Sequence, residues 1–109
     1  MTNQILLSAS KLHGNEVKNA QGESLGHVKD IMLDTANNRV AYYVLSFGGL
    51  LGMGDKLFAI PPEAMKINTN DKCFILNIDK DRLKNAAGFD KDRWPNMADA
   101  TFRSNLSQH

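Results

Sequence analysis

The chain of 109 residues has little cysteine, proline or aromatic side chain, and no excess of charge of either sign. Its single cysteine, Cys73, excludes an internal disulfide, and the apolar residues 74–76 that follow it favour a buried thiol over a reactive one. Thirteen basic and twelve acidic side chains are interleaved along the sequence. No surface of one charge is therefore predicted, and we expect no specific nucleic-acid partner.

Long hydrophobic runs are also missing. The first four residues lack the basic flank of a signal peptide, and residues 5–7 are too short an apolar run for its core or for a membrane span. We therefore expect a soluble, cytoplasmic protein with no membrane insertion. The length fits one domain that buries its own core.

What the sequence does contain is a series of short apolar segments separated by turn residues. The segments are 16–19, 24–34, 40–47, 57–60, 65–67 and 73–78. Segments of this length and spacing are typical of a small barrel, in which closure removes exposed strand edges. We predict a mainly β fold, a six-stranded antiparallel β-barrel over residues 5–80 that is closed or nearly closed.

One of these segments, 24–34, breaks the alternation expected of a strand. Its large apolar residues fall on both parities: Leu25, Ile31 and Leu33 on one, Val28 and Met32 on the other. A β-bulge near Lys29 or Asp30, or burial on both faces, would resolve the conflict. The next segment, 40–47, is apolar on both parities, which predicts a central strand covered on both sides.

The pattern changes after residue 78. Asp79 is placed to cap a short helix through Ala86, and Gly88 is a natural stop for it. We assign residues 81–109 to a C-terminal helix and extension, packing on the barrel or on a second subunit. In the extension Ala98, Phe102 and Leu106 repeat at helical spacing, so it forms either an amphipathic helix or a frayed terminus.

The glycine-rich segment 48–56 invites a phosphate-binding interpretation, which its chemistry does not support. Asp55 occupies the position where such a loop needs lysine, and a strand follows where a helix should begin. We predict a flexible connection between strands. Its apolar residues Leu50, Leu51 and Met53 must fold back over the barrel or meet a partner.

Residues that could carry chemistry form no recognisable constellation. Asp30 and Asp34 share a strand parity, but Asp34 opens a turn, where a carboxylate commonly accepts backbone N–H bonds. The three histidines, His13, His27 and His109, have no metal-ligand spacing, and no GxSxG elbow is present. The rings near residues 42–47 and 58 lack the basic neighbours of an RNA-stacking surface. We expect no catalytic residue, no metal site and no cofactor.

Several short motifs, taken in order, resemble those of a known family. They are Leu12-His13-Gly14 with Val17, the run 22–30, Asp34 before its turn, the segment 40–47 with Gly48-Gly49, and Ala59-Ile60-Pro61. In this order and spacing they closely resemble the PRC-barrel domain, which occurs in the photosynthetic reaction centre H subunit and in a ribosome-maturation factor. The resemblance covers about residues 7–78, and residues 88–90 and 94–99 look like the ending of small stand-alone bacterial members.

The resemblance implies a β-barrel that binds proteins and has no family-wide active site. We therefore expect a non-enzymatic protein-binding or assembly module that self-associates, as a homodimer, or docks on another protein. The candidate partner contacts are Leu50, Leu51, Met53, Phe102 and Leu106. The alternative, a ribosome- or RNA-associated factor, is suggested only by the maturation-factor relative, and the near-neutral charge argues against direct RNA contact.

Overall fold

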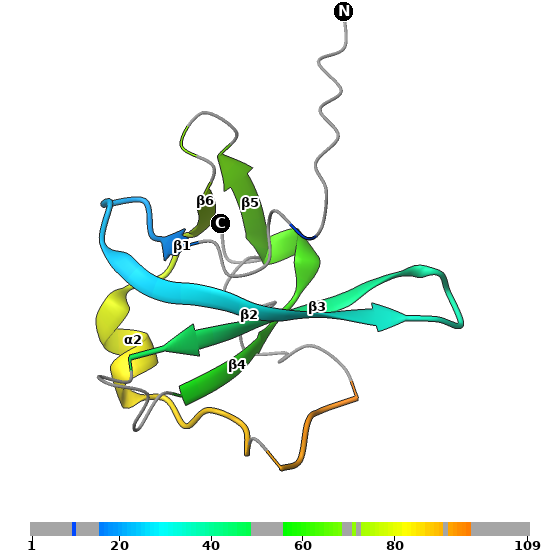
Figure 1. Ribbon diagram of the computed structural model, residues 1–109. Coiled ribbons are helices and arrows are strands. Elements are labelled where there is room, and N and C mark those ends of the chain that lie inside the picture. The colour runs from blue at the N-terminus through cyan, green and yellow to red at the C-terminus, as the bar shows by residue number, and fades with distance from the viewer. Residues whose placement is uncertain are drawn as a thin grey trace, which may run out of the picture.

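The computed structural model describes residues 10, 16–48, 56–68, 71, 73–90 and 92–96. These residues form six strands, a 3₁₀ turn and a short helix (Figure 1). The elements are β1 (Glu16–Lys18), β2 (Ser24–Asp34), β3 (Arg39–Phe47), β4 (Lys56–Ile60), η1 (Pro62–Ala64), β5 (Met65–Asn68), β6 (Cys73–Leu76) and α2 (Lys80–Asn85). The six predicted strands are confirmed.

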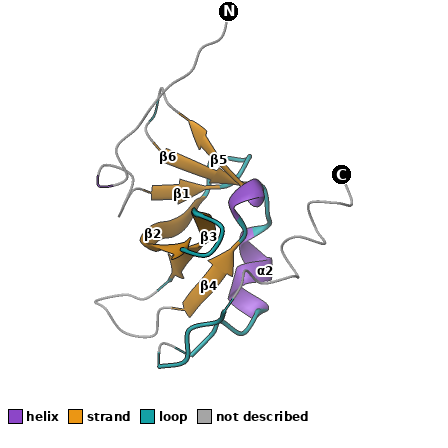
Figure 2. Cartoon of the chain, turned by 90° about the vertical axis from the view of Figure 1, so that its right-hand side faces the viewer, coloured by secondary structure: helices purple, strands orange, loops and turns teal. Residues whose placement is uncertain are grey.

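The strands form one sheet in the order β4-β3-β2-β1-β6-β5. All neighbours are antiparallel except β1 and β6, which are parallel. Within the described residues no ladder joins the edge strands β4 and β5, so the sheet is an open, mixed half-barrel (Figure 2). The prediction of a closed antiparallel barrel was therefore wrong. The alternation of apolar and polar residues identifies strands, but it does not determine which strands lie next to each other in the sheet.

Two bulges explain the broken alternation of β2. Lys29 is an extra residue opposite β3, where Val28 faces Leu45 and Asp30 faces Val44, which confirms the predicted bulge. Leu25 is an extra residue opposite β1, a bulge that the sequence did not reveal. Each extra residue shifts the side-chain alternation, so Leu25, Val28 and Ile31 all reach one core.

The sheet carries apolar side chains on both faces. Its inner face holds the main core, built from Val17, Leu25, Val28, Leu45, Phe47, Phe58, Ile60, Met65, Phe74, Leu76, Ile78 and Leu83. On the outer face of β3 and β4, a smaller cluster of Tyr42, Val44, Leu57 and Ala59 is covered by Phe89 and Trp94. The prediction that β3 is covered on both sides is confirmed for residues 44–47, whereas Val40 and Ala41 are only half-buried.

The end of α2 is set by a lysine from β4. Asp79 occupies the expected N-cap position, although its side chain makes no cap hydrogen bond. At the other end, the Lys56 ammonium donates to the carbonyls of Leu83, Lys84 and Ala86. A cation suits the last turn of a helix, whose free carbonyls carry partial negative charge.

Gly88 does not stop the helix, contrary to the expectation from sequence. Instead it lets the chain cross β4 closely, since an added Cβ would lie 2.6 Å from the Leu57 carbonyl oxygen. The N–H of Phe89 then donates to that same oxygen at 2.7 Å. Residues 86–90 and 92–96, which we call the strap, thus cover the outer face of β3 and β4. No helix in the described part of the chain is long and apolar enough to cross a bilayer.

Candidate functional site

The β2–β3 hairpin extends beyond the rest of the sheet (Figure 1). β1 pairs with β2 only between Ser24 and His27, and β4 pairs with β3 only between Tyr43 and Phe47. Residues 32–42, which we call the arm, are therefore a two-stranded ribbon without a neighbouring strand among the described residues. Because isolated two-stranded hairpins are marginally stable in water, the arm depends on its turn and on side-chain packing.

The arm's turn is organised by Asp34. Its Oδ1 accepts the backbone N–H groups of Ala36 at 3.1 Å and Asn37 at 3.2 Å, and its Oδ2 accepts the Asn37 side-chain amide at 2.8 Å. Arg39 lies 3.8 Å from Oδ2. Asn38 has φ 58°, a left-handed conformation that asparagine adopts more readily than most residues. The structural role predicted for Asp34 is therefore confirmed.

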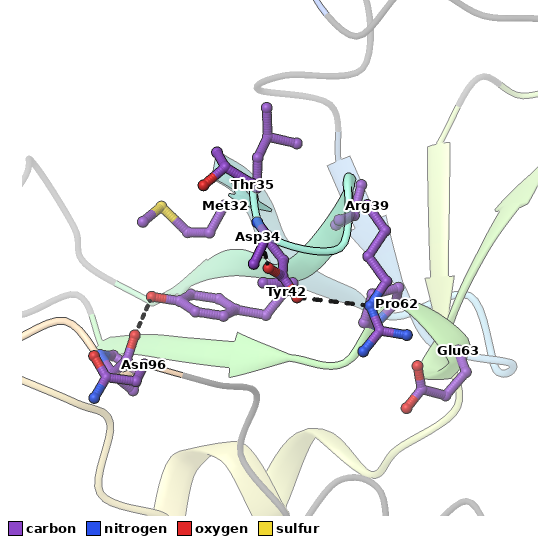
Figure 3. Close-up of a pocket in the computed structure, with 13 residues that line it drawn as sticks. Met32, Asp34, Thr35, Arg39, Tyr42, Pro62, Glu63 and Asn96 are labelled. Carbon is purple, nitrogen blue, oxygen red and sulfur yellow. Dashed lines mark hydrogen bonds and ion pairs between the residues drawn. The ribbon is translucent and has the colours of Figure 1, made fainter.

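At the base of the arm is a groove of about 1020 Å³ (Figure 3). Its walls come from the arm, from η1 and from the end of the strap. The lining residues are Met32, Leu33, Asp34, Thr35, Ala36, Arg39, Val40, Ala41, Tyr42, Pro62, Glu63, Pro95 and Asn96. We call this the arm groove.

A third irregularity explains why consecutive strand residues line one groove. Met32 faces Tyr42 and Leu33 faces Val40, so Ala41 is an extra residue in β3. In a regular strand, neighbouring side chains point to opposite faces, whereas a bulge turns them toward the same side. Val40, Ala41 and Tyr42 can therefore all contribute to the arm groove.

Leu33 stands out among the groove residues because it is 67% exposed. The other large apolar side chain exposed in the described residues, Ile67 on β5, is 38% exposed. The sequence placed Leu33 on the same parity as the buried Leu25, but the arm has left the core by that point. Exposed aliphatic side chains beside a groove are typical of interaction surfaces.

The pKa values of two groups in the arm groove, Asp34 and Tyr42, are shifted away from the physiological range. The pKa of Asp34 is lowered, mainly by the hydrogen bond from the Asn37 side-chain amide. The backbone N–H groups of Asn37 and Ala36 and the charge of Arg39 lower it further. Burial, with a smaller contribution from Asp30, raises the pKa of Tyr42. The neutral Tyr42 hydroxyl donates to the Pro95 carbonyl at 2.8 Å (Figure 3). The arm groove thus offers apolar contact and hydrogen bonding.

The residues singled out from the sequence lie elsewhere. Leu50, Leu51, Met53, Phe102 and Leu106, the candidate partner contacts, are outside the described residues, so their role stays a prediction. His27 is exposed, and Cys73 is buried as expected. Asp30 accepts the N–H of Ile31 at 2.8 Å. Among the residues that the structure describes, no three His, Cys, Asp or Glu side chains gather as metal ligands would.

Sequence reasoning missed the arm groove. The signal that could have found it is the pair Met32-Leu33, two consecutive large apolar residues one position before a turn. A regular strand can bury only one of such a pair on a given face.

The chain matches the family model of the PRC-barrel domain over residues 5–83. It belongs to this family. The resemblance inferred from the sequence is thereby confirmed. In this PRC-barrel protein the matched region includes all six strands, whereas the strap, with its contacts to Tyr42 and Leu57, follows it.

Solved structures also resemble the chain. One is a putative 16S ribosomal RNA processing protein, RimM, from Pseudomonas aeruginosa, with 16% sequence identity and a TM-score of 0.45. The match covers 69% of this chain and 45% of that protein, so the chain spans less than half of its length. Comparison with curated proteins gives no match.

Proposed function

We propose that this PRC-barrel protein is a non-enzymatic protein-binding module whose partner docks in the arm groove. The observation that carries the proposal is Leu33, which is 67% exposed at the wall of a groove of about 1020 Å³. A partner that covers Leu33 would gain stability from it, because burying a large aliphatic side chain stabilises a complex by about 1.5–3 kcal/mol.

The composition of the arm groove suits a protein partner. Apolar groups from Met32, Pro62 and Pro95 form part of its lining, and its charges belong to Asp34, Arg39 and Glu63. Protein interfaces likewise combine apolar contact with a limited number of polar groups. By contrast, RNA binding needs several cations together to neutralise phosphates, and Arg39 is the one basic residue in the lining.

The groove chemistry favours binding over catalysis. A general acid or base works best when its pKa lies near the working pH. The pKa of Asp34 is lowered and that of Tyr42 is raised, and both groups already hold structural hydrogen bonds. They support the arm turn and the strap, so we assign them positioning roles for the docking surface.

The bulges indicate how a partner binds. Extra residues at Lys29 in β2 and at Ala41 in β3 interrupt the ladder between the two strands of the hairpin. Bulges twist a strand edge and prevent regular pairing with another strand. Docking in the arm groove therefore proceeds through side chains rather than by addition of a strand.

Matched substitutions test the proposal in the native cell. Leu33→Asp places a charge at the arm groove, whereas Ile67→Asp makes the same change at the other exposed aliphatic residue, on β5. We expect a defined protein that co-purifies with the unmodified chain to be lost with Leu33→Asp and retained with Ile67→Asp. Retention of every partner by Leu33→Asp, or partners that RNase releases, would refute the proposal.

A further inference from the structure

We propose, resting on the function just assigned, that the segment following the strap, residues 97–109, folds back into the arm groove of its own chain when no partner is bound. We call this segment, which lies outside the described residues, the tail. In this arrangement the tail covers Leu33 and competes with the partner for the same surface.

The first argument is the place where the chain leaves the described structure. Asn96, the last described residue, lines the arm groove, and so does Pro95 before it. The Tyr42 hydroxyl donates to the Pro95 carbonyl at 2.8 Å, next to Asn96 (Figure 3). The tail therefore starts from a fixed point on the wall of the arm groove.

The second argument is effective concentration. A segment joined to its site by a short connection is present there at about millimolar concentration, whereas a separate molecule has to arrive by diffusion. The other apolar segment outside the described residues, 49–55, follows the end of β3 that lies away from the arm. Connectivity thus favours the tail over that segment and over a separate chain as the resting occupant.

The third argument is the position of the exposed aliphatic residues. Leu33, which is 67% exposed, lines the same groove as Asn96. Ile67 is the other such residue in the described part of the chain, and it lies on β5, at the opposite edge of the sheet from β4. Of these two apolar targets, only Leu33 shares a groove with the start of the tail.

The fourth argument is that the tail and the arm both need an apolar surface to pack on. Ala98, Phe102 and Leu106 recur every four residues and would lie along one side of a helix. A helix this short is marginally stable in water by itself. The arm is a two-stranded ribbon without a neighbouring strand in the described residues, and such ribbons are also marginal. Packing the apolar side of the tail against the arm would stabilise both.

Disulfide trapping in the full chain tests where the tail lies. Leu33→Cys places a thiol at the arm groove and Phe102→Cys places one on the apolar side of the tail. Mild oxidation should join them within a single chain, and peptide mass spectrometry identifies the bond. The native Cys73 is buried and is kept in every variant.

Two control pairs make the trapping specific. In one, Ile67→Cys takes the place of Leu33→Cys. In the other, Ser104→Cys takes the place of Phe102→Cys, because residue 104 is about 200° further around a helix. Both control pairs should form the bond several-fold more slowly. No bond between positions 33 and 102, equal rates for all three pairs, or a bond only between two chains would overturn the inference.

Competition for the arm groove gives a second readout in the native cell. Phe102→Asp should increase the amount of partner that co-purifies, because it frees the groove. A tail that fills the groove about two-thirds of the time lowers the apparent affinity for the partner about threefold. Ser104→Asp, which adds the same charge two residues away, should leave the amount unchanged. Unchanged or reduced capture by Phe102→Asp would overturn the inference, since reduced capture would make Phe102 a partner contact.

The two proposals fail separately. If Leu33→Asp loses the partner but no bond forms between positions 33 and 102, the docking function stands and the tail lies elsewhere. If that bond forms but every partner survives Leu33→Asp, the arm groove receives the tail alone and the docking function is rejected.

Discussion

The hydroxyl of Tyr42 donates a hydrogen bond of 2.8 Å to the backbone carbonyl of Pro95, 53 residues further along the chain. This contact joins the base of the arm to the end of the strap. Because the arm groove takes one wall from each, its shape depends on the contact.

Removing the Tyr42 hydroxyl should loosen the strap. Tyr42→Phe keeps the buried ring but leaves the Pro95 carbonyl without this donor, and we expect a loss of about 1 kcal/mol of stability. The fluorescence of Trp94, the sole tryptophan, which packs edge-to-face against Phe89 in the strap, should shift to the red. Tyr43→Phe is the matched control, since within the described residues the Tyr43 hydroxyl makes no hydrogen bond. Equal effects of both substitutions would contradict this account.

Two glycines of the β1–β2 region should differ sharply in their tolerance of alanine. Gly26 has φ 127°, and an added Cβ would lie 2.0 Å from the Ser46 carbonyl oxygen. Gly22 has φ 85°, with nothing within 4 Å of an added Cβ. Backbone strain alone should destabilise Gly22→Ala by about 1–2 kcal/mol. Gly26→Ala adds a clash with backbone atoms, and we expect it to cost roughly 3 kcal/mol or more. Urea denaturation of both variants checks the order, and the account fails if Gly22→Ala is the worse.

Lys56 should stabilise the end of α2. Lys56→Met keeps the aliphatic stem and removes the ammonium that bonds the carbonyls of Leu83 and Ala86. We expect a loss of about 1–3 kcal/mol and faster amide hydrogen exchange in residues 82–86. Lys66→Met, on the exposed surface of β5, should have little effect. Unchanged exchange in α2 would show that the helix ends there for another reason.

The turn of the arm should weaken in acid. A lowered folded-state pKa means that Asp34 stabilises the turn above its unfolded pKa, and that this contribution is lost as the pH falls through the folded value. In a pH titration followed by NMR, the Asn37 amide resonances should move with a midpoint below the usual range of an aspartate. Asp34→Asn should abolish that titration. A midpoint at or above the usual range would contradict the hydrogen bonds described for this turn.

Local features of the fold could be read from the sequence because short-range chemistry determines them. The apolar residues on both sides of Lys29 fall on different strand parities, which indicated a bulge. Asn38 takes the left-handed conformation of its turn. The parallel pairing of β1 with β6 could not be read in this way, because it joins two strands that the other four strands separate along the chain. Lys56 is a similar case, since nothing near it in sequence indicates that it caps α2.

The arm groove was beyond sequence reasoning for a related reason. Its walls at Met32, Pro62 and Pro95 come from segments that only the tertiary fold brings together. Leu33 is exposed because β1 stops pairing with β2, and β4 with β3, before the arm begins. No residue pattern within β2 predicts where this pairing ends. The groove could therefore be found only from the arrangement of strands.

Photo-cross-linking in the native cell tests the central claim, that the arm groove docks a protein, most directly. A photoreactive phenylalanine analogue would replace Leu33 in one strain and Ile67 in another. The account predicts a defined protein adduct, identified by mass spectrometry, from position 33, and much less of it from position 67. Absence of protein adducts at position 33, or the same adducts from both positions, would contradict it.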